Sequence, residues 1–256
     1  MGRGANYAGA SHGGIGSPGN GAARDVAATY GDTHAPTTPG SGGTRTESDE
    51  SGGGVVRIVA AGAVTIDGVI DTDALDSNYS HARGGSGGSI YITCSTFRGS
   101  GGILTAEGGR GNRSGGSGGG GRIAVHYDVT AQSAVPLPGV TFSVRGAKGG
   151  SSQRGGNIGG RHGTLSFPDM QFFESGVLDT RWDYVDVYVP GVSEWTFPSL
   201  VVSGKIAFPE INPLRVAGDA TIQGSGELTL HGGPTNAANP LLPAMRMLLD
   251  GDLTAL

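Results

Sequence analysis

Apolar and polar residues alternate with a period of two through the middle of the chain, most clearly in residues 84–125. The alternation is seen in Ser89-Ile90-Tyr91-Ile92-Thr93 and again in Gly102-Ile103-Leu104-Thr105-Ala106, with glycine runs before and after. This period is typical of short β-strands that point one row of side chains inward and the other outward. Because two short strands cannot bury themselves alone, the pattern predicts that copies of this unit stack.

Such copies lie on both sides of this segment. The shift that aligns residues 56–59 with 90–93 also aligns residues 69–72 with 103–106. A shift shorter by one position aligns Ile90 and Ile92 with Ile123 and Val125, after which the third copy carries an insertion, AQSAVPLPG. The second strands of the second and third copies are followed by glycine-containing turns, AEGGRG and VRGAKGG. Three imperfect copies of one unit predict a solenoid.

The predicted fold class is therefore all-β, and the expected architecture is a right-handed parallel β-helix with glycine at its corners. A ladder of aliphatic side chains is expected to fill its core: Ile58, Ile90, Ile92, Ile103, Ile123 and Val125. A β-sandwich built of hairpins is the alternative, since antiparallel and parallel strands produce the same period of two.

Glycine divides the chain into regions of different character, because most of the 51 glycines precede Arg161. Residues 1–54 are rich in Gly, Ser, Thr and Pro, and are expected to lie along the stack because their glycine-rich turns resemble the later ones. Residues 55–167 hold the repeats. Residues 168–256 continue with short strand candidates, and we expect this region either to continue in a longer chain or to dock on a next subunit.

Charge and composition argue against several classes of partner. The formal net charge is −5, and the 17 Lys and Arg residues are scattered, whereas nucleic-acid binding requires a basic stripe. No stretch of the sequence approaches the length of about 18 consecutive apolar residues that a membrane-spanning helix needs, so no membrane span is expected. Cys94 is the single cysteine, which excludes an intrachain disulfide and suggests a small buried side chain.

The segment IDGVIDTDALD carries the candidate chemistry. Asp67, Asp71 and Asp73 could hold a calcium ion through carboxylate oxygens, or could act as the acids of a polysaccharide lyase or hydrolase, enzymes that also use right-handed β-helices. A solvated strand edge and turn is the simpler interpretation, and we expect no catalytic residues. The six histidines show no metal-ligand spacing. Apart from calcium, no cofactor is expected.

Five aromatic residues gather in the later region: Trp182, Tyr184, Tyr188, Trp195 and Phe197. They are expected to close a core or an interface, and a sugar-stacking platform is the alternative. An ice-binding rod is disfavoured, because neither a regular Thr-x-Thr ladder nor a three-residue glycine period runs through the sequence.

Two Asn-x-Ser sequons occur in loops between strand pairs, at Asn78-Tyr79-Ser80 and Asn112-Arg113-Ser114. Their spacing equals the longer of the two repeat shifts, so both would emerge on one side of a stack. Asn78 and Asn112 are therefore the predicted sites of N-linked sugar.

The units GGSGGSIYI, GSGGILTAEGG and GGGGRIAV resemble the glycine-rich repeats of very large secreted or surface proteins of planctomycetes, myxobacteria, algae and oomycetes. The resemblance covers roughly residues 52–165. It implies a parallel β-helix and an adhesin-like role outside the cell or at its surface. We therefore expect an extracellular structural protein, a stalk, filament or adhesin that self-associates into a homopolymer or belongs to a longer chain. The alternative is a β-helix that binds or cleaves polysaccharide.

Overall fold

The computed structural model describes residues 7–19, 26–43, 51–77, 81–149, 159–208, 212–230 and 247–255. The fold is all-β, and the one helix in these ranges is α1 (Val129–Gln132), a single turn capped by the Asp128 side chain. Strands are paired in parallel at every contact found among the described residues. The hairpin sandwich expected as the alternative is therefore wrong, because hairpins pair their strands antiparallel.

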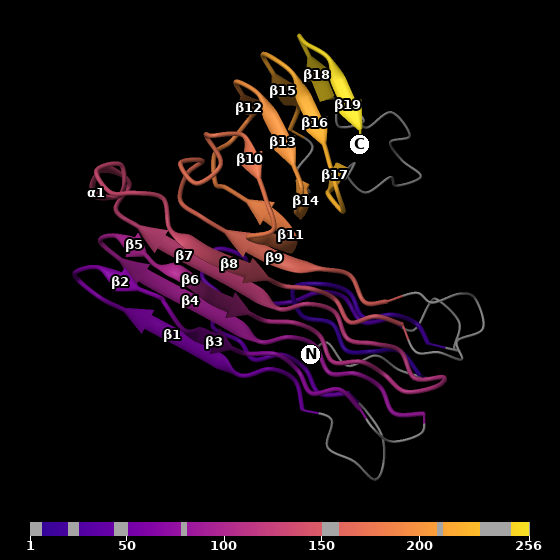
Figure 1. The fold of residues 1–256 in the computed structure, drawn as a ribbon. Helices are drawn as coiled ribbons and strands as arrows, with labels where there is room; N and C mark the ends of the chain where they lie inside the picture. Colours follow the sequence, from indigo (N-terminus) through magenta and orange to yellow (C-terminus); the bar gives the residue numbers. More distant parts are fainter. Residues whose placement is uncertain are drawn as a thin grey trace.

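The repeats form the lower part of the molecule in Figure 1, a nearly closed, barrel-like sheet. One layer contains β1 (Val55–Val59), β4 (Ser89–Cys94), β7 (Arg122–Tyr127) and β9 (Gly163–Ser166). The facing layer contains β3 (Val69–Asp71), β6 (Ser100–Thr105) and β8 (Gly139–Ser143). A separate small sheet pairs β2 (Val64–Thr65) with β5 (Phe97–Arg98).

Strand register follows the sequence repeat. Val56 pairs with Ile90 and Val69 with Ile103, both at the longer repeat shift. Ile90 pairs with Ile123 at the shorter one. The register predicted from the repeat is thus confirmed. These offsets keep each apolar row on the same face of successive strands, as a buried face requires.

The inner row is fully buried at four of the six positions predicted for it, Ile90, Ile92, Ile123 and Val125, and Ile58 on the edge strand packs against it half-buried. The prediction for Ile103 is wrong, since this side chain is 39% exposed and its neighbour Leu104 is buried instead. Both residues are apolar, so the period of two leaves the phase of this strand open. The phase is decided by pairing, because Leu104 stands beside Phe142 of β8 on the inner face.

Strand β11 (Trp182–Tyr188) joins the two layers. Its first residues, Trp182 and Asp183, pair with β8, whereas Val185–Tyr188 pair with β9. Between these halves Tyr184 has a φ of +56° and the register shifts by one residue. This extra residue is a β-bulge, which bends the strand and lets it cross from one layer to the other.

A second stack rises from β11 in the upper part of Figure 1. Three parallel sheets build it. The first contains β10 (Val177–Leu178), β13 (Leu200–Val202), β16 (Ala220–Ile222) and β19 (Leu253–Ala255). The second contains β12 (Trp195–Phe197), β15 (Leu214–Val216) and β18 (Met247–Leu249). The third adds β14 (Lys205–Phe208) and β17 (Glu227–Leu230) to β11.

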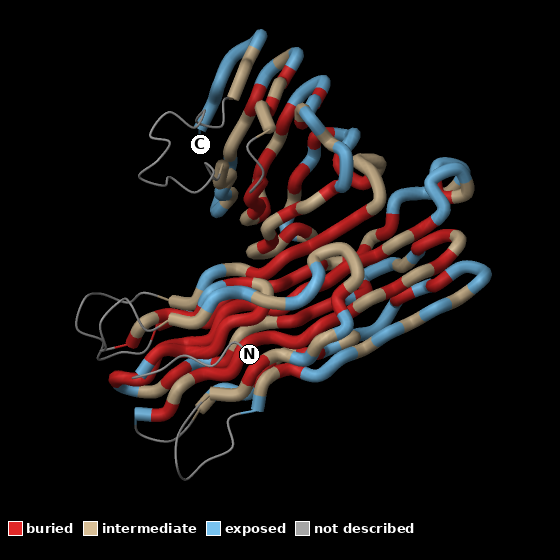
Figure 2. The backbone as a smooth tube through the Cα atoms, turned by 180° about the vertical axis from the view of Figure 1, so that it is seen from behind, coloured by how far each residue is buried: buried red, intermediate tan, exposed pale blue. Residues whose placement is uncertain are grey.

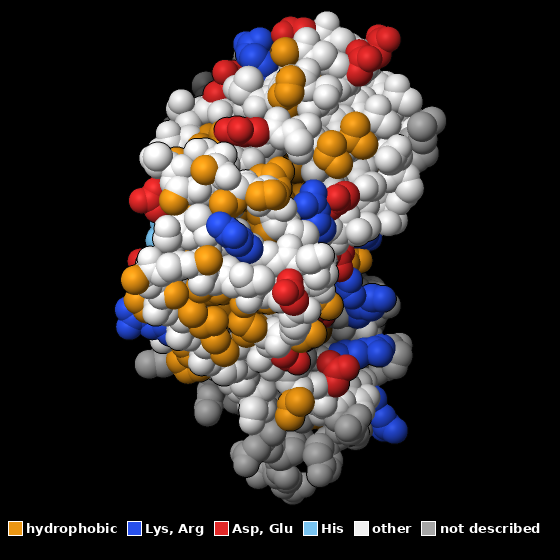
Figure 3. All heavy atoms as spheres, turned by 60° about the vertical axis from the view of Figure 1, so that its left-hand side comes forward, with side chains coloured by type: hydrophobic (Ala, Val, Ile, Leu, Met, Phe, Trp, Pro, Cys, Tyr) orange, Lys and Arg blue, Asp and Glu red, His pale blue; other side chains and the backbone are white. Residues whose placement is uncertain are grey.

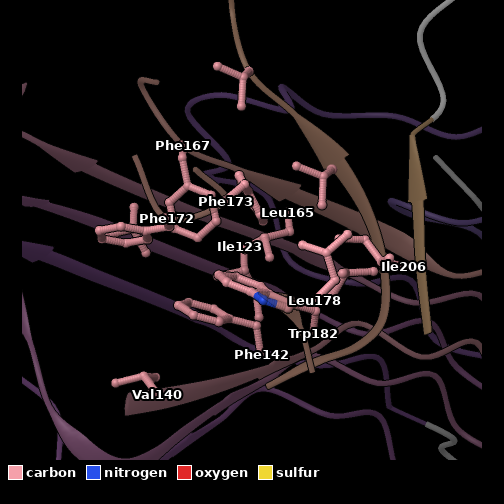
Figure 4. Close-up of a cluster of buried hydrophobic side chains, with 14 of the residues drawn as sticks. Ile123, Val140, Phe142, Leu165, Phe167, Phe172, Phe173, Leu178, Trp182 and Ile206 are labelled. Carbon is pink, nitrogen blue, oxygen red and sulfur yellow. The ribbon is translucent and has the colours of Figure 1, made fainter. Parts of the chain in front are cut away.

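Aromatic side chains fill the junction between the two stacks (Figure 4). Trp182 lies parallel to Phe142, with ring centroids 5.4 Å apart, and packs at 4.7 Å against Phe173. Phe173 in turn contacts Trp195 of the second stack. One continuous hydrophobic core therefore spans both stacks.

The glycine runs form a bundle of extended backbones around residues 115–122. Within this run, residues three positions apart bond to the same neighbouring segment. The N–H groups of Gly116 and Gly119 donate to the carbonyls of Tyr7 and Ala10, and those of Gly118 and Gly121 to the carbonyls of Gly109 and Ala106. A three-residue period is that of a polyproline II-type helix, which has no internal hydrogen bonds and bonds only to its neighbours.

Glycine is required in this bundle because the backbones touch. A Cβ on Gly121 would lie 2.1 Å from the carbonyl oxygen of Gly88, and one on Gly118 would lie 1.8 Å from that of Gly85. Both distances are far below van der Waals contact, so a side chain would force the strands apart. Figure 2 shows that these runs are buried, like the strands.

Residues 26–43 cross the outer face of the layer that contains β7. The Arg122 side chain, which is buried, donates to the Tyr30 carbonyl at 3.0 Å and to the Thr33 hydroxyl at 2.8 Å. The Ser89 hydroxyl donates to the Thr38 carbonyl at 2.6 Å. The glycine- and proline-rich segment is thus held on the stack by side chains of the strands beneath it.

Candidate functional site

A cleft of about 700 Å³ lies where the second stack leaves the first. Glycine-rich residues 13–15 and 159–162 form one wall, with Thr29 at its side. The opposite wall is the outer face of three strands, with Asp186 and Tyr188 from β11, Ala207 from β14, and Glu227 and Thr229 from β17. The cleft is therefore built from segments that are far apart in the sequence.

Strand alternation puts the polar side chains into the cleft. Val185 and Val187 are buried in the core, so Asp186 and Tyr188 point to the other face. Asp186 pairs with Ala207, and Ala207 pairs with Thr229. These three residues form one row across the wall, and Ala207 leaves space between the two polar members.

Burial dominates the electrostatics of Asp186. It raises the pKa of this carboxyl to about 7, against the opposing charge of Arg161. The physical reason is that a partly desolvated carboxylate loses hydration, which favours the neutral acid. Near neutral pH the group is therefore part protonated and can donate a hydrogen bond as well as accept one.

Next to the cleft lies a charged cluster around Tyr184. The guanidinium carbon of Arg145 lies 3.9 Å from the centroid of the Tyr184 ring, and the Lys205 ammonium lies 4.8 Å from it. The His162 ring packs against the same tyrosine at 4.9 Å. Arg145 also pairs with Asp183 at 2.8 Å. The unusual backbone of Tyr184 is thus held by contacts on several sides, as strained residues at functional sites are.

His162 connects this cluster to the cleft. Its Nδ1 accepts a hydrogen bond from the Gly146 N–H at 3.2 Å, which leaves Nε2 to carry the proton in the neutral ring. A smaller hollow lined by His162, Lys205 and Glu227 adjoins the cleft. This face therefore carries both hydrogen-bond donors and acceptors.

Asp67, Asp71 and Asp73 are not brought together as a metal site. Asp67 accepts from the Ser100 N–H and Asp71 from the Asp73 N–H, each at 2.7 Å. Asp73 is half-buried and accepts from the Thr105 hydroxyl at 2.8 Å. Burial raises the pKa of the Asp73 carboxyl. These carboxylates accept hydrogen bonds from backbone and hydroxyl donors of their own and of the neighbouring segment.

Within the described part of the chain, no group of three or more His, Cys, Asp or Glu side chains is placed to hold a metal ion. Asp71 is the last residue of β3, and the backbone beyond it continues to bond to the neighbouring segment, from the Thr72 and Ala74 N–H groups to the carbonyls of Thr105 and Glu107. The carboxylates of Asp71 and Asp73 are each used by hydrogen bonds of this stack. No helix in the described ranges is long and apolar enough to cross a membrane.

The two predicted sugar sites have different outcomes. Asn78 lies outside the described residues. Asn112 is half-buried, and its backbone carbonyl accepts from the Gly115 N–H at 3.0 Å. The Ser114 hydroxyl of the same sequon is buried and bonded to His81. Glycosylation of Asn112 stays a prediction.

The aromatic group divides between core and surface. Trp182, Trp195 and Phe197 are buried in the junction and in the second stack, so the expected core role holds for them. Tyr184 and Tyr188 are half-buried on the outer face, at the charged cluster and in the cleft.

Sequence reasoning did not single out Arg145, Arg161, His162, Asp186 or Glu227. One signal was available for the bulge. In WDYVDVY, Trp182 and Val185 are three positions apart, whereas Val185 and Val187 keep the period of two. A phase shift of this kind within a strand indicates an extra residue. No local pattern shows that β11 and residues 159–162 share a cleft.

Comparisons with protein-family models, with curated proteins and with solved structures find no match for this chain.

Proposed function

We propose that this chain is an extracellular structural protein that forms a rigid stalk, filament or surface adhesin by stacking of β-coils. In this proposal both stacks are turns of one parallel β-helix. The observation that carries it is the unbroken run of parallel pairing from β1 through β11 to β17. Backbone hydrogen bonds along such a run resist bending and stretching in one direction, which suits a load-bearing element.

The glycine bundle supports the same role. Its backbones bond to neighbours on several sides, and the contacts at its glycines leave no room for a side chain there. A bundle of this kind adds a second hydrogen-bonded body alongside the strands. The extracellular setting rests on the resemblance of the repeats to those of large surface proteins, and N-linked sugar at Asn112 belongs to the same proposal.

Self-association would use the open side of the sheet. β1 and β3 stand at the two ends of the sheet path, and each has one strand partner in the described part of the chain. Val59 and Val69 on these strands are 66% and 64% exposed. An unpaired edge with apolar side chains is a template for a further strand. Figure 3 shows that hydrophobic side chains gather in patches on the side that lies at the left of Figure 1.

Electron microscopy of the purified chain over a range of concentrations tests this proposal. We expect elongated particles whose power spectrum has an axial reflection near about 4.8 Å, the spacing of stacked strands. Val59→Lys should shorten or abolish them, because a charge on an edge strand opposes pairing. Leu137→Lys changes an exposed residue away from the edge and serves as the matched control.

Discrete monomers of the unaltered chain at every concentration would contradict self-association. Filaments that persist unchanged in Val59→Lys would place the contact elsewhere on the molecule.

A polysaccharide-binding or polysaccharide-cleaving protein is the second candidate function, and the cleft is the observation that favours it. The calcium dependence considered from the sequence gains no support from the positions of Asp67, Asp71 and Asp73.

A further inference from the structure

We propose that the cleft between the glycine-rich wall and the outer face of β11, β14 and β17 binds a neutral saccharide of more than one ring, held by Asp186, Tyr188 and Glu227. This inference deepens the second candidate function, on which it rests, and it does not depend on self-association.

The dimensions of the cleft fit a ligand of this size. Its volume of about 700 Å³ lies within the range of about 300 to 1,000 Å³ that is usual for small-molecule sites. Asp186 on β11 and Glu227 on β17 stand on the same wall, with β14 between them. Two strand spacings, about 10 Å, therefore separate these strands, a span that one sugar ring alone does not bridge.

The chemistry of the walls favours a polyhydroxyl compound. Two carboxyl groups, Asp186 and Glu227, can accept hydrogen bonds from vicinal hydroxyls, and Arg161 and the threonine hydroxyls supply donors. Tyr188 brings an aromatic ring to the same wall. A pyranose ring has both polar edges and an apolar face, so it matches this combination.

Other ligand classes fit less well. A phosphate or uronate group would meet two carboxyl groups and only one arginine, Arg161, among the described residues of the cleft. A bound metal ion would require more ligands than the described residues gather. An apolar ligand would remove the remaining hydration of the Asp186 carboxyl without supplying a hydrogen-bond partner, which costs free energy. A neutral hydroxyl-rich ligand avoids these conflicts.

The glycine-rich wall is held to the bundle by close backbone contacts. A Cβ on Gly14 would lie 2.2 Å from the Arg161 carbonyl oxygen, and one on Gly160 would lie 2.1 Å from that of Gly118. The Arg161 N–H donates to the Ile15 carbonyl at 2.7 Å. Because these contacts already order the wall, we expect that binding of a ligand costs little further ordering of it.

Isothermal titration calorimetry with neutral hexasaccharides tests the proposal. Cellohexaose, laminarihexaose, xylohexaose, mannohexaose and chitohexaose are the probes, and hexagalacturonate is the anionic comparison. At least one neutral probe should bind with a Kd of about 1 mM or tighter. Asp186→Ala, Glu227→Gln and Tyr188→Ala should each weaken that binding about tenfold or more, since each removes one part of the wall.

The matched control is Glu174→Gln, at an exposed carboxyl outside the cleft, and it should bind within about twofold of the unaltered chain. Thermal unfolding of each variant shows whether it is folded. Failure of every neutral probe to bind would overturn the proposal. So would tighter binding of hexagalacturonate, or binding that survives all three cleft substitutions. The same saccharide titration of the Val59→Lys variant, which is expected to be monomeric, measures binding independently of filament formation.

Discussion

His12 is fully buried between the glycine bundle and residues 26–43. Its Nδ1 lies 2.8 Å from the Gly87 carbonyl oxygen, which can only accept, so Nδ1 carries the proton and donates. Nε2 lies 3.2 Å from the Thr38 hydroxyl and accepts from it. The neutral ring thus satisfies both partners, and burial lowers the His12 pKa to about 4.

This histidine makes stability depend on pH. Its folded pKa of about 4 lies below the ordinary value of 6.5, so its contribution is complete above pH 6.5 and is lost as the pH falls toward 4. At pH 5 the loss should be about 2 kcal/mol. Urea unfolding at pH 7 and pH 5 should show a smaller difference for His12→Gln than for the unaltered chain. Equal differences would contradict this assignment.

Asp186 should act in the opposite direction. Its folded pKa of about 7 lies above the ordinary 3.8, so the folded state binds the proton more tightly, and stability falls as the pH rises from about 4 to 7. Asp186→Asn removes this ionisation and should be more stable than the unaltered chain at pH 8 by about 2 to 4 kcal/mol. Because other groups also titrate, the measured quantity is the difference between variant and unaltered chain at each pH. A stability difference between Asp186→Asn and the unaltered chain that stays the same from pH 5 to pH 8 would contradict the raised pKa of Asp186.

At the scale of the strand, Ile92 and Ile103 are a matched pair of aliphatic residues on opposite faces of the layers. Ile92 is fully buried and Ile103 is 39% exposed. Ile92→Asp should destabilise the fold by about 4 kcal/mol or more, because it buries an unpaired charge, whereas Ile103→Asp should cost about 1 kcal/mol or less. Thermal unfolding of both variants decides the question. Equal losses would mean that the strand phase is wrong.

The glycine segments offer a second element-level test. A Cβ on Gly121 would lie 2.1 Å from a backbone oxygen, whereas one on Gly54 would meet nothing within 4 Å. Gly121→Ala should therefore cost about 3 kcal/mol through overpacking. Gly54→Ala should change stability by about 0.5 kcal/mol or less. Chemical denaturation measures both. A tolerated alanine at Gly121 would show that the bundle is looser than its contacts indicate.

For the whole molecule, the aromatic junction determines whether the two stacks unfold together. Trp182 is buried and contacts Phe142 of the first stack and Phe173, which reaches Trp195 of the second. Trp182→Ala should destabilise the chain by about 4 kcal/mol. Calorimetry should then resolve two transitions, because the shared core no longer couples the stacks. An unchanged single transition would show that backbone pairing through β11 is sufficient.

The repeat and its period of two were enough to predict an all-β fold and the pairing of β1, β4 and β7 residue by residue. Local alternation has a physical cause that acts within each strand, since one face is buried and the other is not. The same reasoning was wrong at Ile103, where two adjacent apolar residues leave the phase undetermined. The period of two also left a β-sandwich of hairpins as an alternative, because the period is the same for parallel and antiparallel strands.

Tertiary structure alone decided the rest. The sequence shows no regular pattern that matches the three-residue contact period of the glycine bundle. This period arises because residues 115–122 bond to residues 7–10 on one side and to residues 106–109 on another. The cleft likewise depends on β11 leaving one layer and joining the other at the Tyr184 bulge. A single strand carries the local signal of its own faces. Which distant segment lies opposite that strand is set by how the chain packs, and the chemistry of Asp186 follows from that packing.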